Sequence, residues 1–312
     1  MKRLILPFII LFLFSKTIFA CDSCGCTMAR VSSERKLSEK SKMIFFDTIV
    51  EQQVWHKRDP QLAHELHHQG HDSHDKTSEE FYHFALGASP WERITLLAEI
   101  PYVVRHALEV DNHAYVGGRQ RSEGFGDLSL NAILKALKSK DNFLGPVAGI
   151  KLPTGRTTER NKQNEKFEPE MQPGSGSFDS IMGAAYQYRL GRTEFHGNSL
   201  FTLRTKGSQE FRYGNLFSSY LYADYLLNPE SEYFKTKVGV DSALQIENHQ
   251  RSKGTEIVDS GGTTWLLGPE ISTQGNRYIS IFGNFLFPVY QNLGGVHQLV
   301  QFIWNAGVKI SF

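Results

Sequence analysis

The chain has 312 residues and a formal net charge of +1, from 34 lysines and arginines against 33 aspartates and glutamates. This near-neutral balance, without a strong acidic or basic bias, argues against a nucleic-acid partner. The 12 histidines and three cysteines are gathered largely near the N-terminus, and they are candidates for metal ligands.

Residues 1–20 have the composition of a secretory signal peptide. Two basic residues, Lys2 and Arg3, precede the apolar run 4–14, and Ala20 suits cleavage. Beyond this segment, no apolar run reaches the length of about 18 residues that a membrane helix needs. Since lipid accepts only helices and closed barrels, the exported chain could span a membrane only as a barrel.

Residues 21–42 form a polar segment that we expect in the periplasm. Its cysteines, Cys21, Cys24 and Cys26, have a spacing that suits Cu(I) or Zn(II). In the oxidising periplasm, Cys21 and Cys24 could instead close a disulfide. Residues 18–21 also partly resemble a lipobox, which would make Cys21 a lipid anchor. The sequence leaves these three alternatives open.

From Met43 to Phe312, apolar and polar residues alternate with the period of two that indicates β-strands. In the last segment, Val300, Phe302 and Trp304 begin one apolar face that we expect to contact lipid, and Asn305 and Lys309 lie on the other. The twelve predicted strands are 43–56, 80–90, 93–106, 125–138, 143–152, 177–190, 193–205, 214–227, 233–248, 262–273, 277–290 and 296–312.

The connections between these segments alternate in length. Connections after even-numbered strands have two to five residues, as at 91–92 and 191–192, whereas most of those after odd-numbered strands are long, as at 57–79 and 153–176. Bacterial barrels combine short periplasmic turns with longer extracellular loops. We therefore predict an all-β protein, a transmembrane up-and-down antiparallel β-barrel of about 12 strands over 43–312, located in the bacterial outer membrane. A soluble immunoglobulin-like or lipocalin-like fold is the alternative.

Charged residues recur on the face opposite the apolar one, strand after strand. A dry core would not accept charges at this density, but a wet lumen would. The residues predicted to line the lumen are Glu99, Arg105, Lys135, Arg204, Lys235, Asp241 and Glu247. This lining favours a small polar or ionic solute.

The first long connection is rich in histidine. Its six histidines, interleaved with acidic residues, are His56, His64, His67, His68, His71 and His74. Neutral imidazole is a common ligand of Zn and Cu, so this loop is a second candidate metal site. The alternative is a solvated loop that binds divalent ions incidentally. Because the loop is predicted outside the cell and the cysteines in the periplasm, we do not expect one joint site.

Three motifs, in this order, resemble the family of outer-membrane proteins named for the meta-pathway of phenol degradation. The motifs are Gly124-Phe-Gly-Asp127, Lys151-Leu-Pro-Thr-Gly155 and Pro173-Gly-Ser-Gly-Ser-Phe-Asp179. The resemblance covers about 45–312 and implies a transporter-like barrel, with a hydrophobic or aromatic solute. From the residues alone, Pro153 and Gly155 end a strand, and Gly174 and Gly176 permit a tight return of the chain.

The chain ends on Phe312, with Ile310 two residues before it. This ending resembles the signal by which outer-membrane barrels are handed to the barrel assembly machinery, which we therefore expect as a partner.

An outer-membrane channel or transporter for a small solute is thus the first functional hypothesis. Metal capture by the cysteine segment and the histidine loop is the second. A barrel lipase is the third, but His83, His106 and His196 have no obvious nucleophile beside them in the sequence. We therefore expect that the protein is not an enzyme.

Overall fold

The computed structural model describes residues 43–57, 74–109, 119–139, 141–231, 233–258, 260–275, 278–293 and 298–312. The cysteine segment and most of the histidine loop lie outside these ranges. No helix in the described part of the chain is long and apolar enough to cross a membrane.

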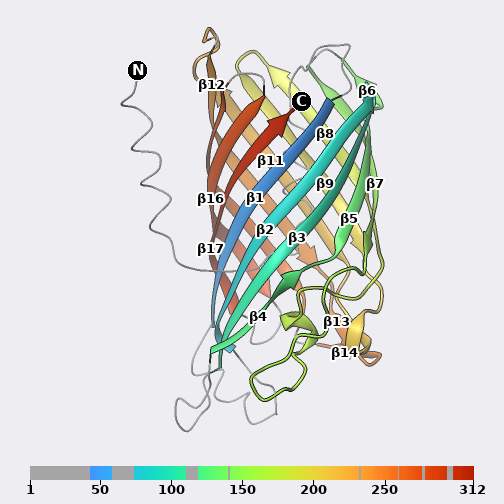
Figure 1. Cartoon of the computed structure of the whole chain (residues 1–312). Coiled ribbons are helices and arrows are strands. Elements are labelled where there is room, and N and C mark those ends of the chain that lie inside the picture. Colours follow the sequence, from blue (N-terminus) through green and yellow to red (C-terminus); the bar gives the residue numbers. More distant parts are fainter. Residues whose placement is uncertain are drawn as a thin grey trace.

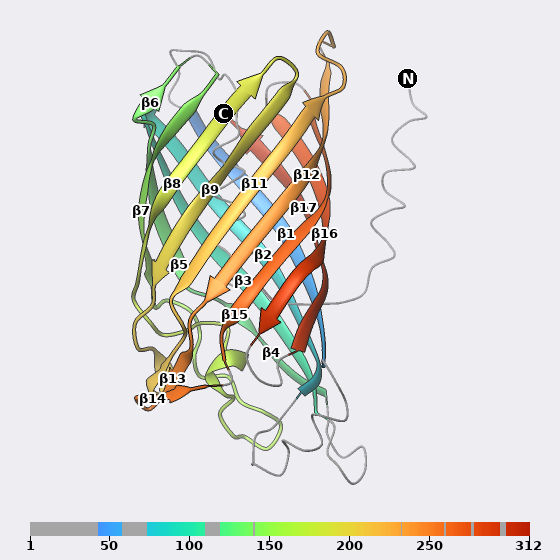
Figure 2. The same ribbon diagram turned by 180° about the vertical axis from the view of Figure 1, so that it is seen from behind.

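Antiparallel strands form one closed barrel, in which the first strand pairs with the last (Figures 1 and 2). Eleven of its twelve wall positions are single strands: β1 (Met43–Lys57), β2 (His74–Trp91), β3 (Ile94–Glu109), β7 (Phe143–Leu152), β8 (Asp179–Leu190), β9 (Thr193–Leu203), β11 (Leu216–Leu226), β12 (Phe234–Glu247), β15 (Gly262–Gly275), β16 (Ile279–Leu293) and β17 (Gln298–Ser311). The twelfth position is shared by β4 (Arg119–Phe125) and β5 (Leu128–Leu134), which both pair with β3. The predicted barrel of about twelve strands is confirmed.

The remaining elements are short. At the end with the short turns, β6 (Leu137–Lys138) pairs with β7. At the opposite end, β10 (Phe211–Arg212), β13 (Gln250–Ser252) and β14 (Thr255–Ile257) form a small sheet of their own. Two 3₁₀ turns, η2 (Pro169–Met171) and η3 (Ser208–Glu210), belong to the long loops at that same end. By the loop-length rule for bacterial barrels, this is the extracellular end.

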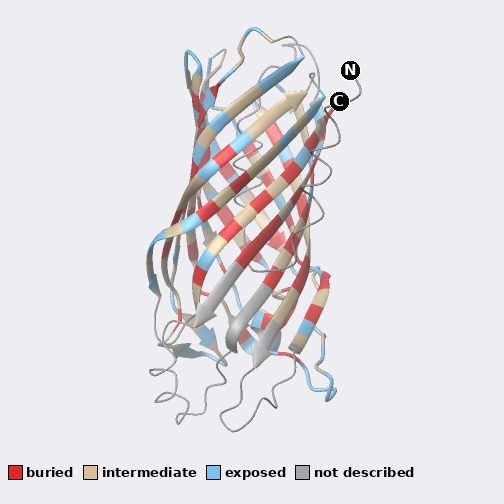
Figure 3. Cartoon of the chain, turned by 90° about the vertical axis from the view of Figure 1, so that its left-hand side faces the viewer, coloured by how far each residue is buried: buried red, intermediate tan, exposed pale blue. Residues whose placement is uncertain are grey.

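The wall has two chemically different faces, as the period-two alternation predicts. Outward-facing side chains such as Phe46, Leu86 and Val240 are exposed, whereas Asp47, Glu51 and other inward-facing ones are buried. Figure 3 shows this as buried bands alternating with intermediate or exposed ones along each strand. An exposed apolar outer belt around a polar interior is the arrangement that a lipid bilayer stabilises.

The sequence-based assignment of Val300 to the lipid face is wrong. A β-bulge shifts the register, because Val54 pairs with Phe302 while Trp55 pairs with Val300. A bulge inserts one extra residue and reverses the side on which the preceding side chains point. Val300 is therefore buried inside the barrel, with 2% of its surface exposed, while Phe302 and the following even-numbered residues stay on the outer face.

The interior is not polar throughout. One apolar cluster includes Phe45 and Phe143, which lie near the periplasmic ends of β1 and β7. A second cluster, on the wall formed by β11, β12, β15, β16 and β17, contains Tyr220, Tyr222, Ala243, Leu266, Leu286, Val300 and Ile303. The sequence pattern predicts charged and polar side chains on the inner face, and the structure adds these two apolar clusters to them.

Candidate functional site

The barrel interior and its extracellular mouth hold the polar chemistry of the molecule. Of the residues predicted to line the lumen, Glu99, Asp241 and Arg204 are buried inside the wall. The other four are placed as follows: Arg105 and Glu247 are part-buried in ion pairs, Lys235 lines an internal cavity, and the Lys135 Nζ atom lies 5.4 Å from the Phe143 ring centre near the periplasmic end.

Several of these charges have partners elsewhere on the inner wall. Arg105 Nε lies 2.8 Å from Glu79 Oε2, and Arg204 Nη1 lies 2.9 Å from Glu247 Oε1. His83 Nδ1 lies 2.8 Å from a Glu99 oxygen, with both side chains buried. Pairing is what makes such charges tolerable inside the wall. Glu79 was not among the predicted lumen residues, and His83 had no predicted partner. Both occupy odd-numbered positions of β2, the side of this strand that faces inward, and this alternation could have revealed them.

The three sequence motifs meet at the extracellular rim. Asp127 accepts hydrogen bonds from the backbone N–H of Gly155 (2.9 Å) and of Ser175 (2.9 Å) through its two carboxylate oxygens. A Cβ atom at Gly155 would lie 2.6 Å from the Gly174 Cα, so both positions need glycine for the chains to approach this closely. The motifs therefore fasten the long loop between β7 and β8 to the barrel wall.

Lys151 stands at the centre of the same junction. Its ammonium lies 2.8 Å from Asp179 Oδ2 and 3.6 Å from Asp127 Oδ2, and it donates to Ser175 Oγ at 2.9 Å. All three charged side chains are at most 8% exposed. One cation thus neutralises two buried carboxylates that belong to different motifs.

The loop held by this junction crosses the barrel mouth. We call Phe167–Gln172 the mouth segment; it includes η2 and lies at the open extracellular end in Figures 1 and 2. On one side, Arg105 of β3 donates to the Gln172 carbonyl oxygen. On the other, Tyr213 Oη, beside β11, donates to the Pro169 carbonyl oxygen at 3.1 Å. Since β3 and β11 lie on different sides of the barrel, the segment bridges its opening.

Glu170 of the mouth segment lies within electrostatic reach of acidic groups on the barrel strands. Its carboxyl reaches solvent but is surrounded by protein, and desolvation raises its pKa from 4.5 to about 7. The negative charges of Glu168, Glu247 and Glu79 raise the pKa further, whereas a hydrogen bond from Gln250 lowers it. Glu79 and Glu247 come from β2 and β12, so acidic groups from two sides of the barrel act on Glu170. Sequence spacing gave no indication of this grouping.

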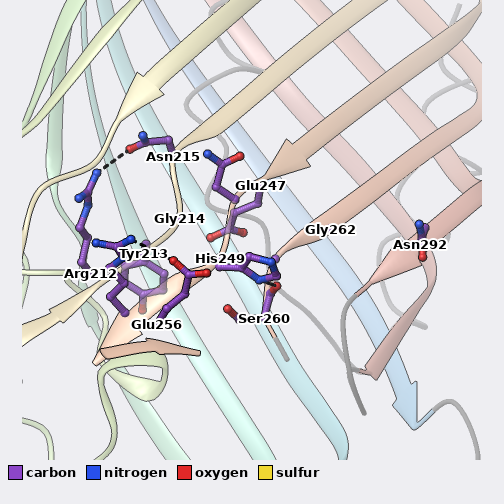
Figure 4. Close-up of a pocket in the computed structure, with 13 residues that line it drawn as sticks. Arg212, Tyr213, Gly214, Asn215, Glu247, His249, Glu256, Ser260, Gly262 and Asn292 are labelled. Carbon is purple, nitrogen blue, oxygen red and sulfur yellow. Dashed lines mark hydrogen bonds and ion pairs between the residues drawn. The ribbon is translucent and has the colours of Figure 1, made fainter. Parts of the chain in front are cut away.

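A cavity of about 540 Å³, lined in part by Tyr213, lies at the extracellular end of the barrel (Figure 4). Its lining combines positive charges, negative charges and amides. Among the lining residues are Arg212, Arg251, Glu247, Glu256, His249, Asn248 and Asn292. His249 donates its Nδ1 hydrogen to the Ser260 carbonyl oxygen at 2.7 Å, which orients the ring at the cavity edge. Mixed charges and amides suit a hydrated polar solute better than an apolar one.

A smaller cavity, of about 90 Å³, lies deeper in the barrel. Asp224, Glu270, Lys237 and Lys309 line it together with His196. His196 is buried, stacks on Tyr222 with ring centres 4.8 Å apart, and lies 3.0 Å from Asp224 Oδ2. A barrel lipase would need its histidine on the outer face near one rim, and His196 instead faces the lumen.

The predicted metal ligands fall almost wholly outside the described residues. Cys21, Cys24 and Cys26 lie there, as do His64, His67, His68 and His71. His56 and His74 are described as backbone only, at positions in β1 and β2. Within the described ranges, no group of three or more His, Cys, Asp or Glu side chains is arranged to hold a metal ion.

Comparison with solved structures places this barrel among outer-membrane proteins. The COG4313 outer membrane channel from Pseudomonas putida F1 superposes with a TM-score of 0.59 at 14% identity, over 89% of this chain and 98% of that one. The β domain of the Bordetella autotransporter BrkA superposes with a TM-score of 0.51 at 8% identity, over 88% of this chain and 100% of that one. At these identities the likeness concerns the fold.

Comparison with curated protein sequences found no match. A family model described as "Putative MetA-pathway of phenol degradation" matches residues 92–291, which is more than half of the chain and contains all three motifs. This protein is an outer-membrane β-barrel that belongs to that family.

Proposed function

We propose that this protein is an outer-membrane channel for small polar or ionic solutes. The observation that carries the proposal is the charged inner wall, in which ion-paired side chains border cavities at the mouth and deeper in the barrel. A lipid-facing belt with a polar, partly hollow interior is the architecture by which barrels pass solutes across the outer membrane. The description of the Pseudomonas putida barrel as a channel supports this proposal.

The mouth segment and the two apolar clusters keep the path narrow, so the solutes should be small. A small aromatic solute is the second candidate, because the family description names phenol and because Tyr220 and Tyr222 belong to an apolar stretch of the inner wall. We do not propose a catalytic role: the buried His196–Asp224 pair faces the lumen and has a structural partner in Tyr222.

The test is single-channel recording with the purified full-length protein in planar bilayers. We expect discrete, uniform conductance steps in KCl, because hydrated ions should find a continuous polar path. Addition of phenol to one side distinguishes the two solute classes: a concentration-dependent block favours the aromatic one, and an unchanged current favours the polar one. Heat-denatured protein is the control, and folded barrel that gives no steps would contradict the channel proposal.

The current should depend on pH through Glu170, whose pKa is about 7. Below this pH the carboxyl is neutral and the mouth segment rests beside Glu247 and Glu79. The raised pKa means that the protonated carboxyl stabilises the mouth segment in its position across the opening. This stabilisation is lost as the pH rises from 4.5 to about 7, where the carboxyl ionises in place. We therefore expect a larger K⁺ current at pH 8 than at pH 6.

The matched variant for this prediction is Glu170→Gln, which keeps the shape of the side chain but cannot ionise. Its K⁺ current should vary much less between the two pH values. A variant that follows the wild-type pH profile would show that another group controls the effect.

A further inference from the structure

The register of the barrel places four carboxylates and two amides in one row along the inner wall. Each member pairs directly with the next across neighbouring strands, with Gly239 of β12 between Glu270 and Asp224. We call these residues the carboxylate row: Glu51, Asn305, Asn284, Glu270, Asp224 and Glu194. All six side chains are at most 9% exposed.

Gly239 explains how the row accommodates its charges. A Cβ atom at this position would collide with the Asp224 carboxylate. The missing side chain therefore leaves the space that Asp224 occupies inside the wall.

The row follows the path that a solute would take. Neighbouring strands are about 4.8 Å apart and tilt by about 40° to the barrel axis, so a row perpendicular to seven strands climbs by about 18 Å along that axis. The deeper cavity touches the row at Asp224 and Glu270. The carboxylates are therefore distributed along part of the barrel axis and do not form a ring at one depth.

Negative charge exceeds positive charge among the buried side chains that the structure describes. Among buried side chains there are ten carboxylates, three lysines or arginines and two histidines. Their part-buried ion-pair partners Glu247, Arg105 and Lys237 bring the totals to eleven carboxylates and five cations. The excess remains if both histidines are protonated and if Lys135 and Lys235 are added. Lys237 pairs with two members of the row, at 3.1 Å from Glu194 and 3.6 Å from Asp224.

An acceptor atom in the row adds an independent observation. Asn305 donates through its Nδ2 to Asn284 at 2.9 Å, while its own Oδ1 has no hydrogen-bond partner among the described residues. Asn305 is 3% exposed and pairs with Glu51 on the adjacent strand. A buried oxygen without a donor is stabilised by water or by a cation.

We propose that the interior selects cations over anions, and that the carboxylate row sets this preference. The inference rests on the channel function proposed above. Low-dielectric walls strengthen the field of the excess carboxylates, which raises the local concentration of cations and repels anions. A series of oxygen ligands spread along the path lets a cation move between sites instead of stopping at one. The solutes that fit are small cations, either hydrated metal ions or organic ammonium ions.

The test measures the reversal potential of the purified full-length channel in a tenfold KCl gradient at neutral pH. We expect the sign that corresponds to K⁺ permeation. The double variant Glu194→Gln, Glu270→Gln keeps the side-chain shapes but removes two negative charges, and its K⁺/Cl⁻ permeability ratio should fall by at least half. The matched control, Glu165→Gln, alters an exposed carboxylate in the long loop and should leave the ratio unchanged.

Each outcome has a separate meaning. A wild-type ratio of one or below in a conducting protein overturns the selectivity inference and leaves the channel proposal standing. An unchanged ratio in a folded, conducting double variant overturns the assignment of selectivity to the row. Folded wild-type protein without conductance overturns the channel proposal, and the selectivity inference with it. If the double variant does not migrate as a heat-modifiable barrel, the wild-type reversal potential still decides the sign of the selectivity.

Discussion

Replacement of Lys151 by methionine is expected to destabilise the folded barrel by about 3–5 kcal/mol. The ammonium of Lys151 lies within ion-pair distance of both Asp127 and Asp179, and all three side chains are buried. Methionine has a similar length but no charge, so it would leave two carboxylates close together inside the wall without this cation. Unfolding by urea in lipid vesicles, followed by tryptophan fluorescence and by the heat-modifiable gel shift, measures the change.

Lys162→Met is the control for this variant, because Lys162 is exposed in the loop between β7 and β8. It should change the unfolding free energy by less than about 0.5 kcal/mol. If Lys151→Met unfolds at the wild-type urea concentration, the Lys151 ion pairs do not contribute to the stability of the barrel.

Replacement of residues 157–172 by an Asn-Gly turn is expected to raise the single-channel conductance several-fold. This change removes the mouth segment, which bridges β3 and the start of β11. The cut is geometrically reasonable because the base of the loop is already closed: the Gly174 N–H donates to the Arg156 carbonyl oxygen at 2.8 Å. The bonds from Asp127 to Gly155 and Ser175 are kept, so the rim should stay folded.

A shorter deletion separates the mouth segment from the rest of the loop. Removal of 161–165, most of which is exposed, leaves Phe167–Gln172 in the chain and should change the conductance little. If this tip deletion and the full replacement have equal effects, the mouth segment is not the constriction. Unchanged conductance in the full replacement would place the narrowest point deeper, beside the apolar clusters.

The sequence by itself determined the barrel. Alternation with period two is a direct consequence of strand geometry, and a polar face on strand after strand requires a wet interior. The parity of short and long connections added the up-and-down topology. These features are local, so they can be read without knowing which strands are neighbours. The inward position of Glu99, Arg204 and Asp241 follows from the same alternation.

The tertiary structure alone decided which side chains meet. Asp127 bonds to Gly155 and Ser175, which are 28 and 48 residues further along the chain, and their spacing does not reveal this junction. Glu51 and Glu194 share one row because of the register across seven strands. A single bulge places Val300 in the lumen instead of on the lipid face. Strand register depends on how distant strands pair, and a bulge of one residue reverses the face on which side chains point. No short stretch of the sequence encodes the register or the position of a bulge.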